Sequence, residues 1–451
     1  MHRTAARKGL LRPLPPMDLP FLVLVLTLVA FGLVMLCSAS SAVALYRRGD
    51  AFAYLRPQLL YAAMGLGAMW TASRVDYHIY HKLAWPLLAL SLVLLTAVVL
   101  FATGVVGSSV TMAKDFIDTA RIALLPGSGW PQQTGVSEVT QVEPLTGSFV
   151  ELGKEGCVVY SRSGKKLNSI QSGYARPALA AGRNRFVLYN RSGNELRVES
   201  RTQNLYTKQM ENSIFLCAVA DNGNLAVVTE DISAMAKLLV YNANMEEVLR
   251  WSMSSNDGTP LRMAFSPDSR KLAAAAVTAS GGQMMTNLYL INLASGDPVS
   301  IANQSGVPQW LGWTSASTLL AVYDTRVVLY NAGGGERAAY EFAGNTLKDV
   351  SVDAAGNIAL LLGSGQLHQT VLLDKNLNVQ FSGSVASANA IVRAGSLFYL
   401  LSDSGVECCN VSGERQWSQT LAAKPQALLA DTKELLLFSG NTAQVLEPPQ
   451  E

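Results

Sequence analysis

The sequence has almost no net charge and few of the residues that build catalytic or metal centres. Lys and Arg number 35 against 33 Asp and Glu, a net charge of +2 over 451 residues. Nucleic-acid binding needs a basic surface, and the only basic cluster is the N-terminal tail, so nucleic acid is excluded as a partner. The five cysteines are scattered and form no disulfide framework.

Histidine is equally scarce, and no catalytic or nucleotide-binding motif is present. Of the four histidines, His2, His78, His81 and His368, a single one lies in the C-terminal two thirds of the chain. Neither a P-loop nor an HExxH, GxSxG or EF-hand pattern occurs. The sequence therefore predicts no catalytic residues, no cofactor and no metal site.

The residues before Gly107 are, by contrast, rich in apolar side chains. Three apolar segments predict three transmembrane helices, the second weakened by Gly65 and Gly67. The segments are Pro20–Leu36, Gln58–Ser73 and Leu83–Thr103. A cleaved signal peptide is the alternative for the first, but its apolar run is longer than a signal-peptide core and further apolar segments follow.

Basic residues indicate the orientation of these helices. The tail carries four of them, which favours a cytoplasmic N-terminus. Three spans then place everything after Gly107 outside the cytoplasm. If the second helix does not insert, the C-terminal part lies inside.

Three motifs in the apolar region resemble a known family. They are GLVMLCSAS at Gly32–Ser40, SRVDY at Ser73–Tyr77 and KLAWPLL at Lys82–Leu88. Residues 17–106 thereby resemble the first three helices of the SEDS (shape, elongation, division and sporulation) proteins. Those proteins are lipid II polymerases with about ten helices, which work with penicillin-binding partners. The later helices and the acidic outer loop implicated in polymerisation do not follow here, so the resemblance implies a module rather than polymerase activity.

A linker follows the apolar region. Val110–Leu125 predicts a helix with an apolar face that packs on the next domain, and a membrane-surface helix is the alternative. The face comprises Met112, Phe116, Ile117, Ala120 and Leu124. The domains expected are a cytoplasmic tail at 1–16, the transmembrane segment at 17–106, the linker at 107–136 and a strand-rich domain at 137–451.

The strand-rich domain repeats a simple unit. An apolar strand, often ending in Tyr-Asn, is followed by a Gly-rich turn, as in FVLYNRSG (Phe186–Gly193) and VVLYNAGG (Val327–Gly334). Units recur about every 36 to 52 residues, with a shorter first step from Tyr160 to Tyr189. This period is typical of β-propeller blades and predicts seven, or eight if Ala427–Glu447 forms one; an irregular β-sandwich is the alternative.

This domain also resembles a known family. The segments ARIALLPGSGWP (Ala120–Pro131), SGYARPALAAGRNRFVLYNRSGNELRVESRT (Ser172–Thr202) and CAVADNGNLAVVTED (Cys217–Asp231) are similar to an uncharacterised bacterial family of membrane-anchored, propeller-like proteins. The resemblance covers residues 110–445 and implies no activity.

Recurrent polar and aromatic residues have structural interpretations. Aspartates near turns predict Asx-turn hydrogen bonds rather than catalytic pairs. These are Asp221, Asp268, Asp353 and Asp403. The tryptophans are expected to pack between blades rather than to line a ligand surface. These are Trp251, Trp310, Trp313 and Trp417. Cys408 and Cys409 should point to opposite faces of one strand.

The sequence thus predicts a mixed fold of three transmembrane helices, a linker helix and a propeller of seven or eight blades. Its expected function is a non-catalytic binding or scaffold module on the outer side of the bacterial cytoplasmic membrane. Expected partners are the lipid bilayer, a protein or cell-wall ligand on a propeller face, and division or elongation proteins that contact the SEDS-like helices. The alternative is a SEDS-type cell-division or cell-shape protein, truncated and inactive as a peptidoglycan glycosyltransferase.

Overall fold

The fold is described from a computed structural model of the chain. The structure describes residues 19–48, 55–73, 84–95, 110–136, 138–364, 367–386, 388–430 and 435–446. The chain divides into two compact units, Met1–Val106 and Gly107–Glu451. Each unit is described by itself.

The first unit contains helices α1 (Leu19–Arg48) and α2 (Leu55–Ser73) and a shorter apolar helix, Ala84–Leu95. Among the described helices, one is long and apolar enough to cross a membrane, at Pro20–Ala39 with a mean hydropathy of 2.8. The first predicted span thus has a matching helix, whereas three spans are not confirmed. Gly65 and Gly67 dilute the apolar character of α2. Of the third predicted span, Leu83–Thr103, the structure describes Ala84–Leu95, and the rest lies outside the described residues.

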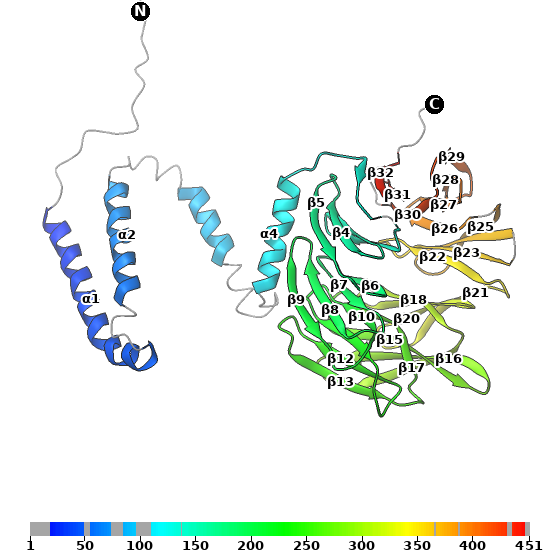
Figure 1. The fold of residues 1–451 in the computed structure, drawn as a ribbon, viewed down its shortest axis with the longest axis horizontal. Helices are drawn as coiled ribbons and strands as arrows, with labels where there is room; N and C mark the ends of the chain where they lie inside the picture. The colour runs from blue at the N-terminus through cyan, green and yellow to red at the C-terminus, as the bar shows by residue number, and fades with distance from the viewer. Residues whose placement is uncertain are drawn as a thin grey trace, which may run out of the picture. The chain divides into compact units, whose positions relative to one another are not determined.

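The second unit opens with helix α4 (Val110–Leu124) and then forms eight four-stranded antiparallel sheets, the blades of a β-propeller (Figure 1). Blades 1 to 4 comprise β2 (Gln141–Leu145), β3 (Ser148–Leu152), β4 (Gly156–Ser161) and β5 (Lys166–Gln171); β6 (Pro177–Ala181), β7 (Arg185–Asn190), β8 (Glu195–Ser200) and β9 (Asn204–Gln209); β10 (Ile214–Val219), β11 (Leu225–Thr229), β12 (Ala236–Tyr241) and β13 (Glu247–Met253); and β14 (Thr259–Phe265), β15 (Lys271–Ser280), β16 (Gln283–Asn292) and β17 (Pro298–Ser305).

Blades 5 to 8 follow the same order. They comprise β18 (Pro308–Ser315), β19 (Thr318–Tyr323), β20 (Arg326–Asn331) and β21 (Glu336–Glu341); β22 (Leu347–Val352), β23 (Ile358–Ser364), β24 (Leu367–Leu373) and β25 (Val379–Ala386); β26 (Ala390–Ala394), β27 (Leu397–Leu401), β28 (Gly405–Asn410) and β29 (Arg415–Thr420); and β30 (Pro425–Ala430), β31 (Leu435–Ser439), β32 (Thr442–Val445) and β1 (Gln132–Gln133).

Burial explains why the strands differ in sequence. Second strands such as β11 (LAVVT) and β19 (TLLAVY) are buried at every residue because neighbouring blades cover both faces, so their apolar runs are continuous. The fourth strand β21 (ERAAYE) alternates exposed and half-buried residues at the rim.

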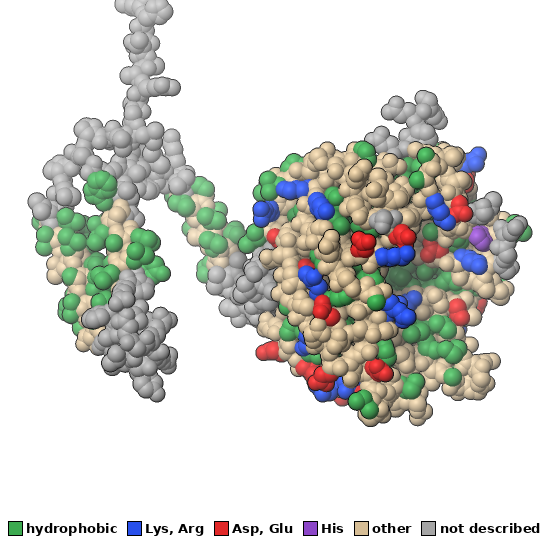
Figure 2. Space-filling model, in the orientation of Figure 1, with side chains coloured by type: hydrophobic (Ala, Val, Ile, Leu, Met, Phe, Trp, Pro, Cys, Tyr) green, Lys and Arg blue, Asp and Glu red, His purple; other side chains and the backbone are tan. Residues whose placement is uncertain are grey.

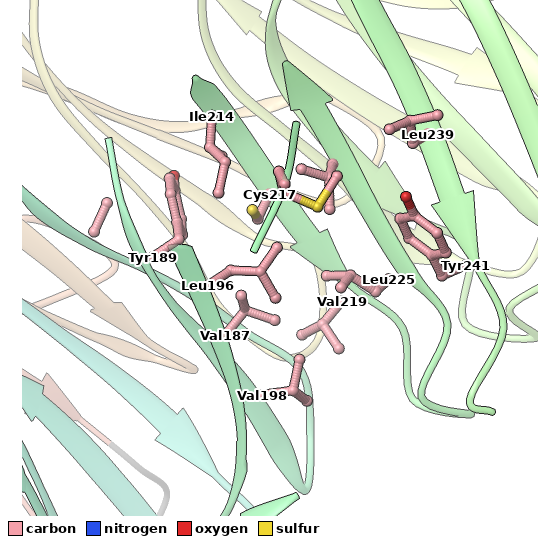
Figure 3. Packing of buried hydrophobic residues seen from close by; sticks show 13 residues of the cluster. Val187, Tyr189, Leu196, Val198, Ile214, Cys217, Val219, Leu225, Leu239 and Tyr241 are labelled. Carbon is pink, nitrogen blue, oxygen red and sulfur yellow. The ribbon is translucent and has the colours of Figure 1, made fainter. Parts of the chain in front are cut away.

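The core lies between blades rather than inside one sheet. Figure 3 shows Val187, Leu196 and Val198 of blade 2 facing Val219 and Leu225 of blade 3. Each such cluster joins two neighbours, so a blade is stable only within the ring.

The two ends of the propeller sequence close the ring. The short strand β1 is the fourth strand of blade 8 and pairs with β32 through Gln132↔Ala443 and Gln133↔Thr442. Next to it Trp130 packs on Phe149, with ring centroids 5.8 Å apart. The predicted propeller is therefore confirmed with eight blades, and the sandwich alternative is wrong.

The repeated Tyr-Asn pair has a structural role in the turn after the third strand. The Asn331 side-chain oxygen accepts hydrogen bonds from the backbone N–H groups of Gly333 at 2.9 Å and Gly335 at 3.0 Å. The short first step of the repeat arises because Tyr189 ends the second strand of blade 2, whereas Tyr160 ends the third strand of blade 1. Blade 2 thus departs from the pattern of its neighbours.

The ring closure contains a buried carboxyl group that makes stability depend on pH. Glu151 is fully buried and accepts a hydrogen bond from Thr134 Oγ1 at 3.1 Å, and burial raises its pKa from 4.5 to about 7. A carboxyl whose pKa is raised on folding stabilises the fold below the unfolded pKa and loses that contribution as pH rises through the folded pKa.

We expect the free energy of unfolding to fall between pH 5 and pH 8.5, by on the order of 2 to 3 kcal/mol from this group. Glu151→Gln should remove that fall, as measured by denaturant unfolding at both pH values. Glu155→Gln, an exposed neighbour, is the control and should leave the pH profile unchanged. An unaltered profile in Glu151→Gln would show that this carboxyl does not titrate on folding.

Candidate functional site

The propeller has two faces that differ in what they carry. One, here the α4 face, is formed by the turns between first and second strands and between third and fourth strands. The turns at 182–184 and 201–203 are examples. The other, here the opposite face, is formed by the turns between second and third strands, such as 230–235, and by the connections between blades.

Helix α4 docks on the α4 face through a buried cluster of charges. Arg185, at the start of β7, donates from Nε to Asp115 Oδ2 at 2.8 Å, and its Nη2 lies 2.8 Å from the same oxygen. Arg201, in the turn after β8, donates from Nη2 to the Asp115 carbonyl at 2.7 Å and to Thr119 Oγ1 at 2.7 Å. Arg201 Nη1 donates to the Thr146 carbonyl of blade 1 at 2.8 Å. One arginine thereby joins α4 to two blades.

The helix buries its polar side and exposes its apolar side. Asp115 is 5% exposed and Ile122 9%, whereas Ile117 is 63% and Leu124 78% exposed. The predicted linker helix is confirmed, and it packs on the propeller. The expected contact residues are wrong, because those whose side chains the structure describes point away from the propeller. The expectation failed because two buried guanidinium groups on the propeller need a carboxylate and carbonyl oxygens.

The electrostatics of the cluster follow from burial. Burial raises the pKa of Asp115, although the neighbouring Arg185 and Arg201 act in the opposite direction. Burial likewise lowers the pKa of Arg201, which is fully buried. Arg201 still has an acceptor for both of its terminal nitrogens. The Asp115–Arg185 ion pair and the hydrogen bonds of Arg201 therefore offset a large desolvation cost, and removal of Asp115 leaves the Arg185 charge buried without its partner.

The chain after α4 lies directly on a turn of blade 1. The backbone N–H of Gly127 donates to Ser163 Oγ at 2.8 Å, and Trp130 Nε1 donates to the Arg162 carbonyl at 2.8 Å. A Cβ at Gly127 would lie 2.3 Å from the Ser163 carbonyl oxygen, so a side chain does not fit. From α4 to β1 the segment thus has fixed contacts with the propeller.

A groove between blades 2 and 3, at the rim of the propeller, is a candidate ligand site. It has a volume of about 370 Å³, and its floor includes Leu239 and Tyr241. The ammonium of Lys208 lies 3.8 Å from the centre of the Tyr241 ring. Glu247 and Arg250 at its edge pair with each other at 2.7 Å. Within the described residues Lys208 has no ion-pair partner, but Glu211 also lines the groove, so charges of both signs lie beside an aromatic ring.

The opposite face exposes large apolar side chains in or next to its turns. Ile232 is 97% exposed and Met235 51% in the turn of blade 3, Met284 is 50% exposed in blade 4, and Leu367 is 75% exposed in blade 6. On the side of the propeller seen in Figure 2, side chains of both charge signs are interspersed. These side chains come from three blades and make the opposite face a candidate interaction surface.

The predicted Asx-turns are confirmed at two of four aspartates. Asp353 accepts hydrogen bonds from the backbone N–H groups of Ala355 and Asn357, and Asp268 accepts one from that of Arg270. Asp221 instead pairs with Arg183 of the neighbouring blade at 3.1 Å. Asp403 binds the side chains of Asn389 and Lys424, both at 2.7 Å. All four carboxylates thus have structural partners.

The tryptophans and the paired cysteines lie as expected. Trp251, Trp310, Trp313 and Trp417 each pack against a buried cluster. Cys408 and Cys409 belong to clusters on opposite faces of blade 7. His368 is half-buried in β24, while the other three histidines fall outside the described residues. A search of the described part of the chain finds no group of three or more metal-ligating side chains.

Sequence reasoning missed the residues that hold α4. Asp115 is one of several charged residues of α4, and Arg185 and Arg201 occur in strand and turn segments without a motif. A signal did exist, because the turn after the third strand of blade 2 begins Ser200-Arg201, whereas blades 3 to 7 have an Asn or Asp at the position of Ser200.

Substitution of Asp115 tests the contact between α4 and the propeller. Asp115→Ala leaves Arg185 buried without its partner, and we expect the free energy of unfolding to fall by about 3 to 5 kcal/mol. The matched control is Asp221→Ala, which removes an Asp–Arg pair on the same face whose arginine side chain is 74% exposed. That variant should lose about 1 kcal/mol or less. Equal losses in the two variants, measured by denaturant unfolding, would contradict a special role for the buried cluster.

Comparison with known proteins gives two separate matches. Residues 131–447 match a family of unknown function (DUF5711), and residues 18–128 match the cell cycle protein family that includes FtsW, RodA and SpoVE. The second match confirms the SEDS resemblance and extends through α4.

The curated relatives match the N-terminal part alone. A probable peptidoglycan glycosyltransferase FtsW of Geobacter sulfurreducens is 39% identical over 92 residues, which are 20% of this chain and 24% of the relative. The stage V sporulation protein E of Bacillus subtilis is 30% identical over 118 residues, 24% of this chain and 32% of the relative. The chain thus spans about a quarter to a third of these relatives.

Solved structures match the propeller. The Dos1 propeller matches with a TM-score of 0.52 at 13% identity. The match covers 72% of this chain and 95% of the Dos1 chain. Sqt1 of Saccharomyces cerevisiae has a TM-score of 0.50 at 10% identity, covering 71% of this chain and 98% of that one. At such identities the likeness shows the fold alone.

By its larger part the chain belongs to the family of unknown function DUF5711, with a SEDS-like fragment ahead of the propeller.

Proposed function

We propose that the protein is a membrane-tethered, non-catalytic scaffold that presents the opposite face of its propeller to a protein or cell-wall ligand outside the cytoplasm. The observation that carries the proposal is that the chain connection occupies the α4 face, which leaves the opposite face available for binding. The α4 face holds the connection to the membrane segment, through α4 and the residues up to β1. The opposite face exposes Ile232, Met235, Met284 and Leu367.

The charge chemistry favours binding over catalysis. The four recurrent aspartates are engaged in turns and pairs, and Glu247 of the rim groove is held by Arg250. Lys208 beside Tyr241 is suited to an anionic group of a ligand. These arrangements recognise surfaces and charges and supply no activated nucleophile.

Orientation follows from the membrane segment. The basic tail favours a cytoplasmic N-terminus. With that start, a single span at Pro20–Ala39 would put the propeller outside, as three spans would. The SEDS-like fragment is suited to contact division or elongation proteins of the membrane, because it matches proteins named for those processes.

Substitutions on the opposite face test the scaffold role. We expect a photo-crosslinking amino acid placed at Ile232 or Leu367 in living cells to give a discrete product, and the same probe at exposed Lys375 on the α4 face to give none. Ile232→Asp with Leu367→Asp should abolish the complex at an unchanged melting temperature, because both side chains are exposed in the free protein. The absence of products at both probe positions would contradict the proposal.

The second candidate is peptidoglycan glycosyltransferase activity, favoured by the 39% identity to proteins that carry this name. We expect no turnover of lipid II by the purified full chain in detergent, because the matched segment spans 24% of such a relative. A full-length SEDS polymerase with its partner is the positive control. Polymer formed by this chain would overturn the scaffold proposal in favour of the enzyme.

A further inference from the structure

Helix α4 has an apolar side that the propeller does not cover. Its inward side holds Asp115, Thr119 and Ile122, whereas Ile117 and Leu124 are 63% and 78% exposed, and Leu125 just beyond the helix is 43% exposed. Ile117 and Leu124 are seven residues apart, two turns of a helix, so they lie on one side. In water these side chains would have no stabilising partner.

We propose that this side of α4 lies in the surface of the lipid bilayer, so that the helix holds the α4 face of the propeller against the membrane. The inference rests on the proposed membrane tethering and adds a second, direct contact with lipid. The helix would then be held from both sides, by the arginines of blade 2 and by the acyl-chain boundary.

Charge complementarity favours lipid as the occupant. Arg121 is exposed one turn after Ile117, and Lys165 lies in the blade 1 turn that Gly127 contacts. Neither has an ion-pair partner among the residues that the structure describes. Basic side chains flanking an apolar helix side are typical of helices that lie in the surface of an anionic membrane.

The rest of the α4 face is consistent with a nearby lipid surface. Val248, Val299 and Val379, at the starts of the fourth strands of blades 3, 4 and 6, are 42%, 58% and 52% exposed. In sequence, α4 follows the apolar helix Ala84–Leu95 by 14 residues. A connection of that length spans at most about 50 Å, which keeps α4 within reach of the bilayer surface.

Depth-dependent quenching tests the proposal on the full chain in vesicles of phosphatidylcholine and phosphatidylglycerol. In a Cys37→Ser background the four propeller cysteines are buried, so a single new cysteine can be labelled with the fluorophore NBD. Ile117→Cys and Leu124→Cys report on α4. Ile232→Cys, equally apolar and 97% exposed on the opposite face, is the matched control.

We expect blue-shifted emission at positions 117 and 124 and at least twofold quenching by doxyl-labelled lipids, with neither effect at position 232. Omission of phosphatidylglycerol should weaken the quenching. Quenching no greater than at position 232 would overturn the proposal. A blue shift without lipid quenching would also overturn it, because another protein surface or a second copy would then cover the helix. Loss of partner crosslinks at Ile232 would leave this result unaffected, so the two proposals fail independently.

Discussion

The buried contact between Asp115 and the guanidinium groups of Arg185 and Arg201 is the interaction on which the arrangement of the second unit depends. It fixes α4 on the propeller, and α4 is the last element before the chain enters the ring through Trp130 and β1. Burying three charges is expensive, and the cost is offset only when every partner is in place. The joint is therefore specific, and it sets the side of the propeller from which the chain arrives.

The joint also explains the irregularity of the repeat. In blades 3 to 7 an Asn or Asp, at the end of the third strand or directly after it, accepts backbone hydrogen bonds within the turn to the fourth strand. In blade 2 the corresponding turn carries Arg201, whose side chain reaches α4. Ser200 holds the position of that Asn or Asp and accepts hydrogen bonds from the backbone N–H groups of Thr202 and Gln203, so the blade 2 turn also closes locally, and the residue after Ser200 makes the long-range contact.

Much of the propeller could be predicted from sequence because its signals are local. Continuous apolar runs mark strands covered on both sides, and Gly, Asn and Asp mark turns, so the repeat and its eighth member at Ala427–Glu447 were recognisable. The closure by β1 was not, because a two-residue strand has no period. The face of α4 was assigned wrongly because hydrophobic periodicity assumes an apolar surface on the other side, and here the surface consists of two arginines. The SEDS resemblance was readable from three short motifs, and the family match continues through α4 to residue 128. A helix within the SEDS-like match thus packs on a domain of another family.

This contact distinguishes an α4 that is an integral part of the propeller domain from an α4 that is a loose connection. Its direct test is hydrogen–deuterium exchange of the full chain in a lipid environment, with the amides of α4 compared with those of β7 and β8. A helix held by the buried cluster exposes its amides only when its contacts with Arg185 and Arg201 are lost. The amides of residues 115–124 should therefore be protected from exchange for hours, on the timescale of the blade 2 strands. Asp115→Ala should abolish that protection while the blades keep theirs. Exchange of α4 within seconds in the unmodified chain would contradict the account.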